Sequence, residues 1–232
     1  MRKQNLLLVP GLLCTARLWR DQIEGLDDIA EMTVARHQLD ASIEEIARRV
    51  LSEAPDRFAL AGLSMGGYIV FEIWRQAPER VSRIALLDTR ATLDPPETTK
   101  ERLEQLKLIE RGRFTGIHRK LAPSFVHPDR ADETALIDAI TGMATETGKN
   151  GFVNQTKAIM GRVDSRPTCR TIDVPTLVLC GRQDTRTPIH MHEEMHGLIP
   201  GSRMVIIEDC GHLSPMERPD EVNTELRAWL AA

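Results

Sequence analysis

Short apolar runs alternate with amphipathic stretches along most of this chain of 232 residues. Several runs are continuously apolar, among them LLLV, RIALL and MVII, as expected for strands covered on both faces of a sheet. The runs predict strands at Asn5–Val9, Glu31–Ala35, Arg57–Ala61, Arg83–Leu87, Pro175–Cys180 and Arg203–Glu208. The stretches between them predict helices at Arg17–Leu26, Ser42–Ala54, Met65–Gln76, Pro188–Leu198 and Pro219–Ala231. Strand–helix–strand units of this length imply right-handed crossovers, so we predict an α/β fold with a mostly parallel sheet of about six strands.

One long stretch, residues 89–173, departs from this alternation. It holds helical patterns at Thr98–Arg111 and Asp132–Ala144 but no run typical of a strand, and Pro95-Pro96 stands near its beginning. We expect such an insertion to lie over one edge of the sheet and not to form an independent domain. The predicted core is therefore residues 1–88 and 174–232, with residues 89–173 as a helical lid.

The junction between the third strand and the next helix carries the first candidate for chemistry. The strand RFALA runs into Gly62-Leu63-Ser64-Met65-Gly66, a G-x-S-x-G motif between a strand and a helix. A serine hydroxyl reacts only when a base can reach it, so it must stand clear of the sheet on a sharp turn. A Cβ at Gly62 or Gly66 is expected to collide with neighbouring backbone there. The motif predicts Ser64 as a nucleophile, although a turn that merely begins a helix would share its letters.

A base and an acid are expected at the same edge of the sheet. Histidine titrates near neutral pH, and of the seven histidines only His212 directly follows an apolar run, in MVIIEDCGH. It thus lies after the last strand, at the carboxyl edge where open α/β sheets bind ligands. Asp184 follows the preceding strand and is predicted to orient the histidine. Asp88, which ends RIALLD, is a rival for that role, or else a turn or capping carboxylate.

Together these residues resemble the α/β-hydrolase superfamily, in particular its small bacterial serine esterases and lactonases. The resemblance covers nearly the whole chain and rests on Pro10-Gly11-Leu12, the motif around Ser64, Gly181-x-x-Asp184 and Gly211-His212. It implies a catalytic triad of Ser64, Asp184 and His212. It also implies an oxyanion hole made by the backbone N–H groups of Leu12 and Met65, and an acyl-enzyme intermediate without a cofactor or metal ion.

Two further expectations follow from this resemblance. Family members usually carry His-Gly in the first loop, whereas this chain has Pro10-Gly11, which leaves open how the loop is held in place. The family's strand order, numbered from this chain's first strand, is 2-1-3-4-5-6. The order reverses between strands 1 and 3, so the Leu12 loop and the Ser64 turn are expected to meet at the switch point.

Composition and charge narrow the setting of this chemistry. The formal net charge of −4, from 30 basic and 34 acidic residues, indicates no nucleic-acid partner. No apolar run approaches the ~18 residues needed to span a bilayer. The four cysteines include no C-x-x-C pair and no export signal precedes them, which predicts reduced thiols and a cytoplasmic location. A disulfide between Cys180 and Cys210 stays open, as does the oligomeric state.

Two other functions compete with a serine hydrolase. The segment His192-Glu193-Glu194-Met195-His196 matches H-E-x-x-H, in which two histidines on one helix face bind zinc, although a solvated helix face is the simpler reading. A ligand sensor that retains the hydrolase pocket would carry the same triad. Chelation distinguishes the first alternative, and multiple turnover on an acyl substrate distinguishes the second.

The expected substrate is a small ester, thioester or lactone, because the chemistry of the triad is acyl transfer. We expect the helical insertion to supply its pocket. Arg119 and Arg162 could receive a substrate carboxylate, or simply face water. Candidate lining residues, some of which would only pack, are Phe114, His118, Phe125, Met143, Phe152 and Met160.

Overall fold

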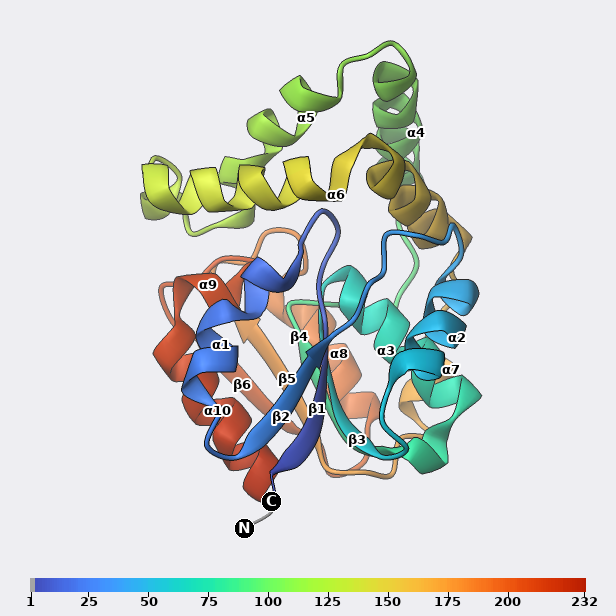
Figure 1. Ribbon diagram of the computed structural model, residues 1–232, viewed down its shortest axis with the longest axis vertical. Helices are drawn as coiled ribbons and strands as arrows, with labels where there is room; N and C mark the ends of the chain where they lie inside the picture. Colours follow the sequence, from blue (N-terminus) through green and yellow to red (C-terminus); the bar gives the residue numbers. More distant parts are fainter. Residues whose placement is uncertain (1–2) are drawn as a thin grey trace.

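A single parallel sheet forms the centre of the computed structural model, which describes residues 3–232 apart from the side chains of residues 115–118. Its strand order is β2-β1-β3-β4-β5-β6, and every neighbouring pair is parallel (Figure 1). The strands are β1 (Gln4–Val9), β2 (Ala30–Val34), β3 (Phe58–Leu63), β4 (Val81–Leu87), β5 (Thr176–Gly181) and β6 (Arg203–Ile207). The α/β prediction, the six strands and their order are therefore confirmed.

The continuously apolar strands are explained by the layers on both faces of the sheet. Along β1, Leu6 and Leu8 pack into one buried cluster, whereas Leu7 and Val9 pack into another. Because successive side chains of a strand point to opposite faces, a strand buried on both sides has no polar positions to alternate with. The run LLLV thus reflects a sheet enclosed between two helical layers.

Helices of the two layers lie largely where the sequence predicts them. One face carries α1 (Arg20–Gly25) and α10 (Pro219–Ala231), and the other carries α2 (Ile43–Glu53), α3 (Met65–Gln76) and α8 (Ile189–Leu198). The first predicted helix is divided, because Ala16–Trp19 is a 3-10 turn that precedes α1. Ser42 caps α2, where its hydroxyl accepts the N–H of Glu45 at 3.2 Å.

Most of residues 89–173 forms a helical layer beyond the end of the sheet (Figure 1). Its helices are α4 (Pro96–Glu110), α5 (Phe114–Leu121) and α6 (Thr134–Gly161), whereas the short α7 (Arg166–Cys169) packs beside the sheet against α3 and α8. The prediction that a helix ends at Ala144 is wrong, because α6 continues to Gly161 through a kink at Gly148, where φ is 72° and ψ is 173°. Within the described part of this segment there is no strand. Its role as a lid stays a prediction.

Candidate active site

The turn between β3 and α3 holds Ser64 in a rare backbone conformation, with φ 55° and ψ −116°. A positive φ is costly for a residue with a side chain, so its surroundings must enforce it. A Cβ at Gly62 would lie 2.5 Å from the Gly66 carbonyl oxygen, and one at Gly66 would lie 2.1 Å from the Val9 carbonyl oxygen. The two glycines therefore permit the turn and bring the end of β1 against it, as the motif predicts.

His212 lies between Ser64 and Asp184 and is within hydrogen-bond distance of both. Its Nε2 is 2.9 Å from Ser64 Oγ, and its Nδ1 is 2.8 Å from Asp184 Oδ2. The residue is 4 % exposed, and its backbone N–H donates to the Phe125 carbonyl oxygen at 3.0 Å. These contacts suit an imidazole that donates Nδ1–H to the carboxylate and accepts the serine hydroxyl at Nε2.

Asp184 is held by the backbone of its own loop. Its Oδ1 accepts the N–H groups of Arg186 and Thr187 at 2.7 and 3.0 Å, and its Oδ2 accepts the Thr187 hydroxyl at 2.5 Å. Burial by itself would raise the pKa of this carboxyl, but His212 and the hydrogen bonds from Thr187 outweigh burial and lower it. Asp184 is therefore a fixed anion beside the imidazole.

Asp88, the rival acid, lies in a different environment. It is fully buried, and its carboxylate accepts the Gly181 N–H at 2.9 Å and contacts the Ser214 hydroxyl. Burial and the neighbouring charge of Asp184 raise the pKa of Asp88 well above its usual range. The Asp88 side chain therefore links the end of β4 to β5 and to the turn after His212. The carboxylate that contacts His212 belongs to Asp184.

The two N–H groups expected to form an oxyanion hole belong to neighbouring segments. Met65 is the first residue of α3, so its N–H has no acceptor within the helix. Leu12 follows β1, and both residues line the same cavity as Ser64. A Cβ at Gly11 would lie 3.3 Å from Ser64 Cβ, which shows how closely the two segments approach.

Two buried polar side chains hold the loop after β1. Leu13, whose φ is 60°, donates its N–H to Gln155 Oε1 at 3.0 Å. His37 Nε2 lies 2.9 Å from the Gly11 carbonyl oxygen and 3.0 Å from Gln155 Nε2. Burial lowers the pKa of His37 to about 4, so this ring is neutral at neutral pH. These contacts answer how the loop is held where the family histidine is replaced by Pro10. Sequence reasoning missed both residues, since no motif links them.

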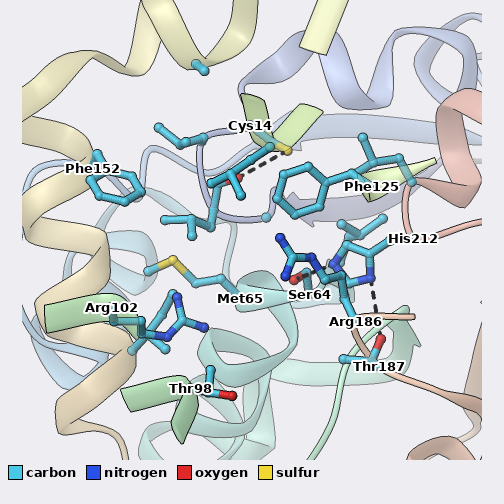
Figure 2. Close-up of a pocket in the computed structure, with 18 of the residues that line it drawn as sticks. Cys14, Ser64, Met65, Thr98, Arg102, Phe125, Phe152, Arg186, Thr187 and His212 are labelled. Atoms are coloured by element: carbon cyan, nitrogen blue, oxygen red, sulfur yellow. Dashed lines mark hydrogen bonds between the residues drawn. The ribbon is translucent and has the colours of Figure 1, made fainter. Parts of the chain in front are cut away.

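A cavity of about 240 Å³ opens in front of Ser64, beneath α4 and α6. Phe125 and Phe152 line it, as predicted (Figure 2). Three of the other predicted lining residues do not line it: Met143 is buried in the core, and Phe114 and Met160 are not among the lining residues. The side chain of His118 lies outside the described residues. Cys14 also lines the cavity, but burial raises the pKa of its thiol to about 12, which disfavours the nucleophilic thiolate.

The arginines of the cavity are not those singled out in the sequence. Arg162 is buried, donates to Asp94 at 2.9 Å and stacks 4.2 Å from the Tyr68 ring centre. Arg119 is exposed and does not line the cavity. The arginines that do line it are Arg90, Arg102 and Arg186. Arg186 stands two residues after Asp184, and this position in the sequence could have indicated that it lines the cavity.

The sequence profile described as alpha/beta hydrolase fold matches residues 40–219. The chain belongs to the α/β-hydrolase fold family. Two relatives are informative over almost the whole of this hydrolase. Pimeloyl-acyl-carrier-protein methyl ester esterase of Aliivibrio salmonicida is 22 % identical and covers 97 % of this chain and 92 % of its own length. A thermophilic esterase from Thermogutta terrifontis, whose structure has malate bound, is 29 % identical, with a TM-score of 0.88 over 98 % of this chain and 89 % of that one.

A third comparison concerns the fold of this hydrolase. The enol-lactonase from Burkholderia xenovorans LB400 has a TM-score of 0.89, covers 100 % of this chain and 93 % of its own, and is 23 % identical. In the part of the chain that the structure describes, none of the helices combines the length and apolar character that crossing a bilayer would require. All four cysteines are free and buried, so Cys180 and Cys210 are not joined.

In this hydrolase the H-E-x-x-H segment lies on α8, and its histidines have different partners. His192 is fully buried, its Nε2 accepts the Thr89 N–H at 3.0 Å, and burial lowers its pKa to about 4. His196 is exposed, and its Nδ1 lies 2.8 Å from the Ser202 hydroxyl. Among the side chains of residues 3–114 and 119–232, no group of three or more His, Cys, Asp or Glu is placed to hold a metal ion.

Proposed function

We propose that this chain is a serine hydrolase that cleaves a small carboxylic ester, thioester or lactone through an acyl-enzyme. The observation that carries the proposal is the chain of contacts at the cavity, 2.9 Å from Ser64 Oγ to His212 and 2.8 Å from His212 to Asp184. A nucleophile, a base and an orienting acid in this order constitute the arrangement that activates a serine.

In the proposed mechanism, Ser64 Oγ attacks the substrate carbonyl while His212 Nε2 takes the hydroxyl proton. The N–H groups of Leu12 and Met65 stabilise the negative charge that develops on the carbonyl oxygen. His212 then gives the proton to the leaving group, which departs and leaves an ester on Ser64. Water, deprotonated by the same histidine, releases the acid and restores the serine.

The relatives and the cavity support a small substrate. The Aliivibrio protein is named as a methyl ester esterase and the Thermogutta protein as an esterase, so ester hydrolysis is the activity we carry over to this chain. A cavity of about 240 Å³ lies below the usual range for ligand pockets, ~300–1,000 Å³, which favours a small substrate.

Hydrolysis of short p-nitrophenyl esters by wild type and Ser64→Ala tests the proposal, together with labelling by a fluorophosphonate. We expect Ser64→Ala to lose about 10⁴-fold or more in kcat and to lose the label. Ser202→Ala is the matched control, because Ser202 lies beside His196 and does not line the cavity. Activity retained by Ser64→Ala would contradict the proposal, and labelling of wild type without turnover on any ester would favour the ligand sensor.

A further inference from the structure

Arg186 brings a positive charge into the same cavity as Ser64 and His212. It stands two residues after Asp184 in the loop that follows β5, and its side chain points into the cavity (Figure 2). The proposed mechanism does not use this side chain. Its backbone N–H holds Asp184, but that contact would be the same for any residue other than proline.

The guanidinium of Arg186 is positioned by neutral neighbours. Its carbon lies 4.7 Å from the centre of the Phe125 ring, and Nη2 donates to Ser124 Oγ at 3.2 Å. The Phe125 ring in turn lies 6.0 Å from the His212 ring. Arg186 forms no ion pair with an acidic side chain in the part of the chain that the structure describes. Its Nε and Nη1 donors thus stay open to a ligand.

The other arginines of this region are neutralised only in part. Asp94 pairs with Arg90, Arg102 and Arg162, so one carboxylate serves three guanidinium groups. Arg186 is an exposed residue, so it keeps contact with water; partial loss of water and the positive charge of Arg102 lower the pKa of its guanidinium, while the charges of Asp184 and Glu101 act in the opposite direction. A cation in these surroundings gains more from an incoming anion than one that already has a carboxylate partner.

We propose that Arg186 binds a carboxylate of the substrate, so that the natural substrate is an ester or lactone with a second, ionised carboxylate. This inference rests on the proposed ester hydrolysis and names its substrate class. The planar guanidinium presents N–H donors in fixed directions to a carboxylate, and stacking on Phe125 fixes its orientation. Because Arg186 and Ser64 line the same cavity, one small substrate can present a carboxylate to the first and its carbonyl to the second.

The test compares monomethyl glutarate with methyl pentanoate, two methyl esters of equal acyl length that differ in one terminal carboxylate. Methanol release gives kcat/KM for wild type, Arg186→Gln and Arg186→Lys. We expect wild type to prefer the acidic ester. In Arg186→Gln the ratio of acidic to neutral kcat/KM is expected to fall about 10- to 100-fold, chiefly through KM, because a charge-assisted hydrogen bond is lost. Arg186→Lys should retain part of this preference.

Arg182→Gln is the matched control. It removes the same charge from another exposed residue of the same loop, but Arg182 pairs with Glu208 and does not line the cavity. This variant should keep both the activity and the ratio. Hydrolysis of both esters by wild type without preference would overturn the inference and leave the proposed function standing. An equal loss on both esters in Arg186→Gln would also overturn it, because that outcome indicates a structural role.

A binding measurement keeps the test independent of turnover. Calorimetric titration with glutarate should show binding to wild type that weakens in Arg186→Gln and persists in Arg182→Gln. If no ester is turned over, the proposed function fails, and glutarate binding alone decides on Arg186. Binding of inorganic phosphate in place of glutarate would overturn the carboxylate assignment.

Discussion

Replacement of Asp184 by asparagine is expected to slow ester hydrolysis by about 10⁴-fold with the fold retained. Asparagine keeps a carbonyl oxygen for the N–H groups of Arg186 and Thr187, which now bond to Oδ1 at 2.7 and 3.0 Å. Its amide nitrogen, however, would face His212 Nδ1 as a donor. The imidazole proton then moves to Nε2, and the Ser64 hydroxyl loses its acceptor.

The size of the effect follows from the distance and burial of the pair. Asp184 Oδ2 lies 2.8 Å from His212 Nδ1, and each residue is 4 % exposed. At an effective dielectric constant of about 20, two unit charges at this separation attract by about 6 kcal/mol. This attraction stabilises the imidazolium of the transition state, and its loss corresponds to about four powers of ten in rate. Because the pair is buried, little water is present to stabilise the imidazolium in place of the carboxylate.

The assay is kcat/KM on p-nitrophenyl butyrate, with thermal unfolding to verify the fold. Asp88→Asn is the matched control, because the raised pKa of Asp88 shows that its site readily accepts a neutral group. An asparagine there can accept the Gly181 N–H and donate to Ser214, so we expect a loss of less than about 10-fold. The reasoning is refuted if Asp184→Asn stays active while Asp88→Asn does not.

Two further predictions concern buried polar groups. Gln155→Leu leaves the Leu13 N–H without its acceptor, so the free energy of unfolding in urea should fall by about 1–3 kcal/mol. We also expect a lower kcat with little change in KM. Unchanged values would contradict the role of Gln155 in holding the loop after β1. His37 and His192 have pKa values of about 4 in the fold against 6.5 ordinarily. The unfolded chain therefore binds more protons between these values, and the free energy of unfolding should fall as pH falls from about 6.5 to about 4. Urea unfolding across that range should give the same dependence of unfolding free energy on pH in wild type and in a variant of the exposed His190. An unfolding free energy that does not change with pH would disprove this account.

The kinked helix α6 shows where prediction from sequence ends. The apolar pattern from Asp132 weakens after Ala144, and the glycines beyond that point favour a loop. Yet α6 continues to Gly161, because its second half packs Phe152 and Ile159 into buried clusters and brings Gln155 to the loop after β1. Contacts distant in sequence outweigh weak local propensity there.

The local pattern of the sequence by itself determined the strands, the turn at Ser64 and the edge at which His212 and two candidate aspartates lie. Short-range sterics and burial on both faces of the sheet decide these features, and both leave a periodic signature. Only the tertiary structure decided that Asp184 and not Asp88 contacts His212, and that Arg186 lines the cavity while Arg162 pairs with Asp94. Such choices depend on distances between segments far apart in the chain, which no local pattern encodes.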